Sequence, residues 1–259
     1  MVKQTTSVEH DFPPYQESAL LALFGKNVRV LDLTHDFGDH IPISPGHAKT
    51  ALWWHLTHEE SRARLGDTSF EGYGVKGIVT CDHTSTHVDA VFHFNKHRAD
   101  LTVDKIPLNY MITPAAWIDV SFVPPRTHIT LENVRAAVAA AGIAVQAGST
   151  LLYYTGAETL WGDHKAFLSQ YPGLNAEATA WILDQGVLNV CTDAPSTDNP
   201  ADTTYPNHTV HAQRLVIHTE LVANIPKIPR HDNFYYAMFP WRITGGTGSP
   251  VRAIALWEE

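Results

Sequence analysis

The order of the apolar runs along this chain of 259 residues constrains its fold more than any other feature. Short runs that are rich in β-branched and aromatic residues, bounded by glycine or polar turn residues, predict β-strands. Such runs lie at residues 27–35, 51–57, 74–81, 115–122, 149–156 and 187–193. Two further strands, joined by a glycine-rich turn, are expected within residues 233–257. We therefore expect a fold in which strands predominate.

Helical patterns are fewer than strand patterns. They lie at residues 17–25, 130–142, 166–171 and 175–186. Thr130 is a suitable N-cap for the second of these helices, and Gly25 would end the first. The order lacks the strict alternation of strand and helix that is typical of Rossmann folds and TIM barrels. We expect a mixed, β-rich α/β fold and, because no linker or repeat divides the chain, a single domain over residues 1–259.

Composition and charge exclude several classes of partner. The net charge of −9, counted with neutral histidine, and the lack of any Lys/Arg run make nucleic acid an unexpected partner. Residues 1–12 hold no apolar signal region, and no apolar stretch approaches membrane-spanning length, so no membrane partner is expected. Cys81 and Cys191 lie far apart and predict free thiols of a reduced compartment. We expect a cytoplasmic protein.

The segment DHTSTHVDAVFHF, residues 82–94, is the strongest functional signal. It places His83, His87, Asp89 and His93 within eleven positions, with no Lys or Arg between the first and the last. In an extended segment all four side chains would point to one side, whereas in a helix His83 and His87 would share a face and Asp89 would be displaced from it. Either geometry can bring imidazoles and a carboxylate to one cation.

Two interpretations of this segment compete. Neutral histidine nitrogen with carboxylate oxygen is the ligand set of catalytic Zn²⁺ and Mn²⁺ sites, which leave positions open for water. Alternatively, the segment is a histidine-rich loop whose side chains cap turns, since the chain has sixteen histidines in all. The density of the cluster favours the metal site.

The same residues resemble the H-x-G-T-H-x-D-x-P-x-H signature of the metal-dependent cyclase family, which includes bacterial kynurenine formamidase and isatin hydrolase. The spacing from His83 to His93 matches at every ligand position. The segment departs from the signature twice, with Ser85 in place of Gly and Val91 in place of Pro. Both departures change the freedom of the backbone rather than the ligand chemistry.

The resemblance extends over most of the chain. Residues 30–47 are similar to the family's N-terminal strand and Pro-rich loop, and the tail at 246–256 is similar to its G-x-x-x-P-x-R-x-x-A terminus. His208 and Glu220 match an H-x₁₁-E arrangement. The resemblance implies the swivelling β/β/α architecture of that family.

The resemblance also implies roles for individual residues. His83, His87 and Asp89 would be metal ligands, with Zn or Mn as the metal, and His93 the catalytic histidine beside them. His208 and Glu220 would form the second half of the site and in some relatives help to hold a second metal. A divalent cation lowers the pKa of bound water from about 16 toward 7, and an imidazole such as that of His93 can move a proton to the leaving group.

These residues predict a metal-dependent hydrolase that uses activated water to cleave an amide-type C–N bond in a small cyclic or aromatic substrate. A lactone hydrolase of the trans-dienelactone type is an alternative within the family. A metal- or ligand-binding protein without turnover is an alternative outside it, although such a protein needs no proton-transfer residue such as His93. In relatives an aromatic segment near Trp53 and Trp54 crosses to the neighbouring subunit, so we also expect a homodimer or homotetramer with one of these residues near a subunit boundary.

Overall fold

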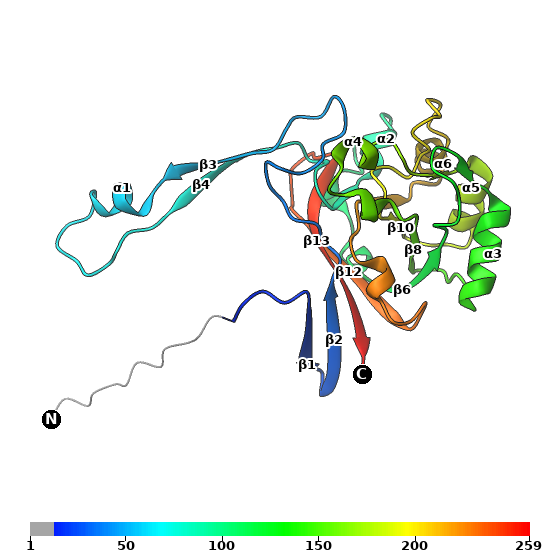
Figure 1. Ribbon diagram of the computed structural model, residues 1–259, viewed down its shortest axis with the longest axis horizontal. Helices are drawn as coiled ribbons and strands as arrows, with labels where there is room; N and C mark the ends of the chain where they lie inside the picture. Colours follow the sequence, from blue (N-terminus) through cyan, green and yellow to red (C-terminus); the bar gives the residue numbers. More distant parts are fainter. Residues whose placement is uncertain (1–12) are drawn as a thin grey trace.

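Most strands of the protein belong to one sheet, seven of whose strands close into a ring. The computed structural model describes residues 13–259 (Figure 1). Residues 1–12, in which the sequence shows no apolar signal region, lie outside the described residues. The sheet consists of β1 (Ser18–Leu23), β2 (Lys26–Asp32), β5 (His87–Asp89), β6 (Ile112–Asp119), β8 (Thr150–Tyr154), β10 (Asn189–Thr192), β11 (Ile217–Glu220), β12 (Phe234–Pro240) and β13 (Gly248–Glu258). The ring runs β13-β12-β6-β8-β10-β11-β5, and β5 pairs again with β13. The order places β5, which has only three residues, where the ring closes.

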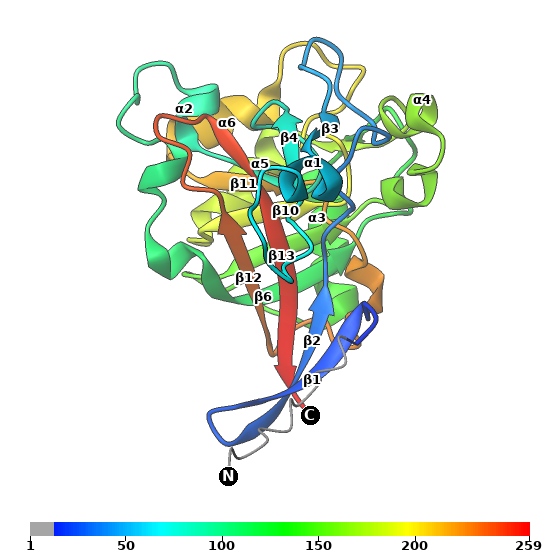
Figure 2. The same cartoon turned by 90° about the vertical axis from the view of Figure 1, so that its left-hand side faces the viewer.

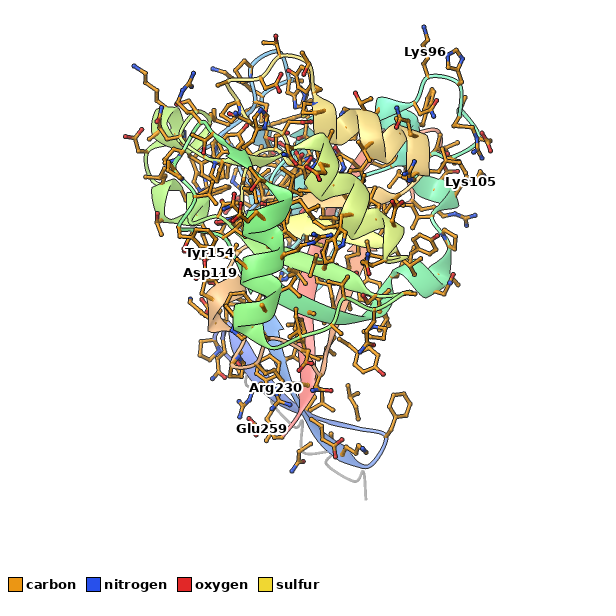
Figure 3. The ribbon with its side chains drawn as sticks, turned by 90° about the vertical axis from the view of Figure 1, so that its right-hand side faces the viewer. Lys96, Lys105, Asp119, Tyr154, Arg230 and Glu259 are labelled. Carbon is orange, nitrogen blue, oxygen red and sulfur yellow. The ribbon has the colours of Figure 1, made fainter. Side chains whose placement is uncertain are left out.

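Helices α3 (Leu131–Ala141), α5 (Ala176–Asp184) and α6 (Pro206–Arg214) lie on one outer side of this ring (Figure 1). The short helices are α2 (Val91–Phe94), α4 (His164–Phe167) and α1 (His58–Arg62), the last of which lies away from the ring. There are 3₁₀ turns at Val103–Lys105, Leu108–Tyr110, Ala157–Leu160 and Ile225–Lys227. Helix α3 begins at the capping box of Thr130 and Asn133 and ends at Gly142, which has a φ of 66°; the capping predicted at Thr130 is thus confirmed. In Figure 3 the green helix α3 and the yellow-green α5 lie in front of the sheet.

The side chains of the central strands alternate between two hydrophobic clusters. Trp117 on β6 and Leu152 on β8 belong to one cluster, which includes residues from the strands around the ring. Their neighbours Ile118 and Leu151 point to the opposite face, where they belong to a second cluster with residues of α3 and α5. Because side chains of a strand alternate, each of these strands serves both clusters. The expected mixed, β-rich architecture is confirmed.

The helix predicted at residues 17–25 is wrong. Residues 18–23 form β1, which pairs antiparallel with β2. Phe24 and Gly25, with φ of 50° and 78°, make the two-residue turn between them. Positive φ at both central positions suits the right-handed twist of a hairpin. Gly25 therefore marks a hairpin turn rather than a helix end.

A separate hairpin projects from the body of the molecule in Figure 1 and is seen end-on, in front of the sheet, in Figure 2. Its strands, β3 (Ala51–Leu56) and β4 (Val75–Val79), pair only with each other, and a second small sheet joins β7 (His128–Ile129) to β9 (Gly173–Leu174). Trp53 is 45% exposed and Trp54 53% exposed on this arm. Trp53 lies over Gly77, where an added Cβ would meet its ring at 2.2 Å. Among the described residues, no helix combines the length and apolar character needed to cross a membrane.

Candidate metal centre

The pairing of β5 with β11 brings three candidate side chains together with His218, which was not a candidate. In this antiparallel pair Asp89 lies opposite His218, and His87 lies opposite Glu220. Val88, between the two β5 residues, points into the ring's core, so His87 and Asp89 point to the outer face. All four side chains are buried. Register alone therefore builds a compact array of two imidazoles and two carboxylates.

His83 joins this array from the segment before β5. Its Nδ1 lies 2.7 Å from Asp89 Oδ1, and its Nε2 lies 2.9 Å from Thr247 Oγ1. The Thr247 hydroxyl donates to Asp82 at 2.8 Å, so the His83 Nε2–H donates to Thr247 and Nδ1 faces the site. A Cβ at Gly248 would meet the His83 ring at 2.6 Å, which is why this position needs glycine.

The two departures from the family signature fit the backbone. Ser85 has a φ of 53°, a conformation that glycine adopts easily and serine rarely. Its hydroxyl donates to the carbonyls of His35 and Asp36 at 2.9 and 3.0 Å. Val91 is the first residue of α2, where proline is also well tolerated. The backbone of the segment from His83 to His93 thus accommodates both departures.

His93 lies on α2, over the same array. Its ring centroid is 4.0 Å from that of His83, and its Nε2 is 3.7 Å from Asp89 Oδ2. The side chain is 29% exposed, unlike that of Asp89, which is 1% exposed. His93 is therefore the member of this group that faces the opening.

Helix α6 supplies His208. The His208 Nδ1–H donates to Asp198 Oδ2 at 2.5 Å, because an ionised carboxylate only accepts. The other nitrogen, Nε2, lies 3.9 Å from Asp89 Oδ2. His87 is held in the same way, with Nδ1 donating to the Ser85 carbonyl at 2.9 Å and Nε2 lying 3.2 Å from Asp89 Oδ1. Both imidazoles thus present a free Nε2 toward the carboxylates.

A cavity of about 660 Å³ opens onto this cluster. All of the residues assigned to the site from sequence line it: His83, His87, Asp89, His93, His208 and Glu220. Loops at 44–47 and 195–205 complete its wall. The structure therefore brings the two separate sequence motifs to one place.

The electrostatics of the cluster depend on Asp89. Burial by itself would raise the pKa of Asp89, but the charges of His83, His93 and His218 outweigh it and hold the pKa well below the usual range. Burial lowers the pKa of His93 to about 4, although Asp89 acts in the opposite direction. Burial also acts to lower the pKa of His218, but Asp89 and Glu220 reverse this and raise the pKa to about 10. Asp89 is thus an anion that several imidazoles share.

Two residues of this cluster were not predicted from the sequence. His218 lies two positions before Glu220 on β11, so strand alternation would have placed both on one face. Asp198 lies in the loop before α6 and reaches His208 only through the tertiary fold. His218 could therefore have been found from its spacing to Glu220, whereas no sequence pattern linked Asp198 to His208.

The donor set fits one or two divalent cations. One ligand atom from each of Asp89, His208, His218 and Glu220 lies within 4.8 Å of the others, and the same holds for His83, Asp89 and His93. Metal-binding histidines usually donate their second N–H to a protein group, as His83, His87 and His208 do here. We call His83, His87 and Asp89 the first half of the site, and His208 and Glu220 the second half.

The β-ring carries a buried histidine–carboxylate cluster under an open cavity, which is the donor set and the setting of catalytic metal centres in hydrolases. The family model described as a putative cyclase matches residues 31–199, and the chain belongs to this cyclase family. It is 28% identical to the kynurenine formamidase of Geobacillus thermodenitrificans, over 86% of this chain and 95% of that protein. It is 26% identical to the isatin hydrolase of Roseibium aggregatum, over 93% of this chain and 97% of that protein. A solved isatin hydrolase bound to the product analogue thioisatinate matches with a TM-score of 0.78 and 24% identity, over 90% of this chain and 93% of that one.

Proposed function

We propose that this chain is a metal-dependent hydrolase that cleaves an amide-type C–N bond in a small cyclic or aromatic molecule. One observation carries the proposal. His83, His87 and His208 each use one ring nitrogen to hold a protein group and direct the other toward Asp89. Metal-binding histidines have the same arrangement, in which a protein group accepts from one ring nitrogen and the other nitrogen faces the metal. The similarity to kynurenine formamidase and isatin hydrolase supports the same reaction class.

The first half of the site would hold the cation, and the second half would hold a second one if two are bound. Nitrogen and carboxylate donors suit Zn²⁺ and Mn²⁺. A divalent cation there would lower the pKa of a coordinated water and polarise the substrate carbonyl. The residues themselves fix the donor positions, since Thr247, Ser85 and Asp198 hold the three imidazoles.

His93 would transfer a proton from the attacking water to the leaving group. Burial keeps its pKa at about 4, so at neutral pH the ring is uncharged and its Nε2 can accept a proton from the attacking water. The same nitrogen would then donate this proton to the leaving amine nitrogen, which must be protonated when the C–N bond breaks. Its partial exposure at the opening of the cavity suits transfer to a bound substrate.

The lining of the cavity favours an uncharged substrate. Among the described residues that line it, none is Lys or Arg, whereas Asp198 and Asp202 add carboxylates. Phe94, Tyr171 and Tyr205 supply aromatic surface. A substrate carboxylate would meet no fixed cation there apart from the metal centre, so we favour an isatin-type cyclic amide over an amino-acid formamide.

The test combines metal removal with a substrate panel. Dialysis against a chelator should abolish hydrolysis, and Zn²⁺ or Mn²⁺ should restore it. Full activity in a sample shown to be metal-free would refute the proposal. Isatin should be a better substrate by kcat/KM than N-formylkynurenine. Faster opening of a simple lactone than of any amide would favour the trans-dienelactone type of activity instead.

We also propose a homodimer or homotetramer in which the arm formed by β3 and β4 contacts a neighbouring subunit. Exposed Trp53 and Trp54 on a projecting hairpin support this, since large exposed apolar groups mark contact surfaces. The double variant Trp53→Ser/Trp54→Ser should lower the mass found by light scattering, whereas Leu108→Ser, at a position 81% exposed outside the arm, should not. An unchanged mass for the double variant would contradict this role for the arm.

A cytoplasmic location is proposed as well. It is supported by Cys81 and Cys191, neither of which forms a disulfide, as is usual in a reducing compartment.

A further inference from the structure

The hydrogen bonds of His218 are the reverse of those of His87 and His208. It lies on β11 opposite Asp89 in the register with β5. Its side chain is 0% exposed, and it is absent from the lining of the cavity. It therefore lies beneath the carboxylates rather than beside the substrate.

Packing fixes the orientation of this ring. Phe94 stacks on it, with a centroid distance of 5.2 Å and an interplanar angle of 18°. His208 and His211 meet it edge-on at 4.8 and 4.7 Å. With aromatic rings on these sides, the imidazole has little freedom to rotate. Its Nε2 is held 2.9 Å from Asp89 Oδ2 and 3.4 Å from Glu220 Oε1.

The surroundings of the other nitrogen, Nδ1, determine whether Nε2 can bind a metal or carries a proton. It is buried and has no hydrogen-bond partner within the described part of the chain. A metal-binding Nε2 would require the ring to carry its proton on Nδ1 alone, where the buried N–H has no acceptor. Nε2 therefore carries a proton. His87 and His208 show the opposite arrangement, with Nδ1 donating and Nε2 free.

We propose that His218 is a positioning residue that donates from Nε2 to Asp89 Oδ2 and so fixes the carboxylate that both halves of the site share. Asp89 Oδ1 faces His83 and His87 in the first half. Asp89 Oδ2 faces His208 in the second half and accepts from His218. The hydrogen bond from His218 thus keeps Asp89 Oδ1 directed toward the first half of the site and Asp89 Oδ2 toward the second half. This inference rests on the proposed function, because it assumes that the cluster binds metal.

The test is the affinity for Zn²⁺, measured by competition with a chromophoric chelator. His218→Leu removes the donor and should weaken Zn²⁺ binding by about 10–100-fold, the usual cost of losing a group that orients a ligand. His218→Gln can return an N–H to the position of Nε2 and should bind Zn²⁺ nearly as tightly as the wild type. His218→Asn, which is polar but too short to do so, should be as weak as the leucine variant.

The matched control is His231→Gln. His231 is half-buried and its Nδ1 donates to the Trp117 carbonyl at 3.0 Å, but it neither lines the cavity nor packs on His218. This variant should keep wild-type affinity. If His218→Leu does not fold, as judged by thermal unfolding of the metal-free protein, the Gln and Asn variants decide the question.

Three results would overturn the proposal. The first is wild-type affinity in the Leu or Asn variant, and the second is a Gln variant as weak as either of these. The third is the loss of one full equivalent of Zn²⁺ at saturation in all three variants, which would make His218 a ligand. A wild-type protein that binds no Zn²⁺ or Mn²⁺ would instead overturn the proposed function itself.

Discussion

Replacing His93 by alanine should separate metal binding from chemistry. His93 is the most accessible residue of the cluster around Asp89, and its neutral ring suits proton transfer. Loss of a general acid–base group costs about 10²–10⁴-fold in kcat. This corresponds to about 3–5 kcal/mol of transition-state stabilisation. Metal content should stay near that of the wild type, because the first half of the site remains intact.

The geometry also defines the competing outcome. His93 Nε2 lies 3.7 Å from Asp89 Oδ2, and a ligand atom of His93 is within 4.8 Å of ligand atoms of His83 and Asp89. A cation held by these three residues would be lost with the ring. Elemental analysis beside single-turnover rates distinguishes the two roles, since loss of metal in proportion to activity would refute proton transfer as the role of His93.

A control and a pH profile sharpen the assay. His97→Ala removes an exposed histidine four residues further along and should change neither metal content nor rate. In the wild type, kcat/KM should fall only below about pH 5, because burial lowers the pKa of His93 to about 4 and the ring accepts a proton only while neutral. An acid limb near the ordinary histidine pKa of about 6.5 would contradict this environment.

Three further predictions follow from single contacts. His87→Ala and Asp89→Ala should each lose metal stoichiometrically by elemental analysis; a full equivalent retained in either would mean that the ligands are misassigned. Gly248→Ala should destabilise the protein by about 1–3 kcal/mol in chemical denaturation, since its Cβ would lie 2.9 Å from a backbone carbonyl oxygen; unchanged stability would show that the strand can shift. Burial lowers the pKa of His35 to about 4, so the unfolded chain binds the extra proton between about pH 6.5 and 4, and the free energy of unfolding should fall by about 1–3 kcal/mol as the pH drops through this window. His35→Phe, which can keep the stack on Trp161, should reduce that dependence, and an identical pH profile in the variant would refute the assignment.

Local patterns predicted the parts of the fold that depend on local physics. Strands such as β6 and β8 carry continuous apolar sequence, and α3 carries its own caps. Residues 18–23 were predicted wrongly because their apolar run suits a helix as well as a strand, and pairing with β2 decided between them. β5 and β11 were not predicted as strands because their sequences, HVD and IHTE, are polar. Their conformation comes from neighbours in the ring.

The site, like the fold, could be predicted from sequence only in part. The resemblance to the family's motifs implied that His208 and Glu220 would join the residues from His83 to His93, and all of them line the cavity. Spacing carried no information about Asp198, which reaches His208 from a loop, or about which imidazole nitrogen faces a partner. The orientation of a ring depends on carbonyls and hydroxyls that only the folded chain brings near.

The position of β5 has a consequence for the order of folding. Asp89 and His218 are 129 residues apart in the chain, and His83 and Thr247 are 164 residues apart. Contacts of such long range form slowly, because the entropy of closing a large loop must be lost before they form. A nascent chain that has not yet included residues 248–250 cannot pair β5 on both sides. Capture of the cation should therefore be a late event in refolding, and metal added at the start should leave the early kinetic phases unchanged.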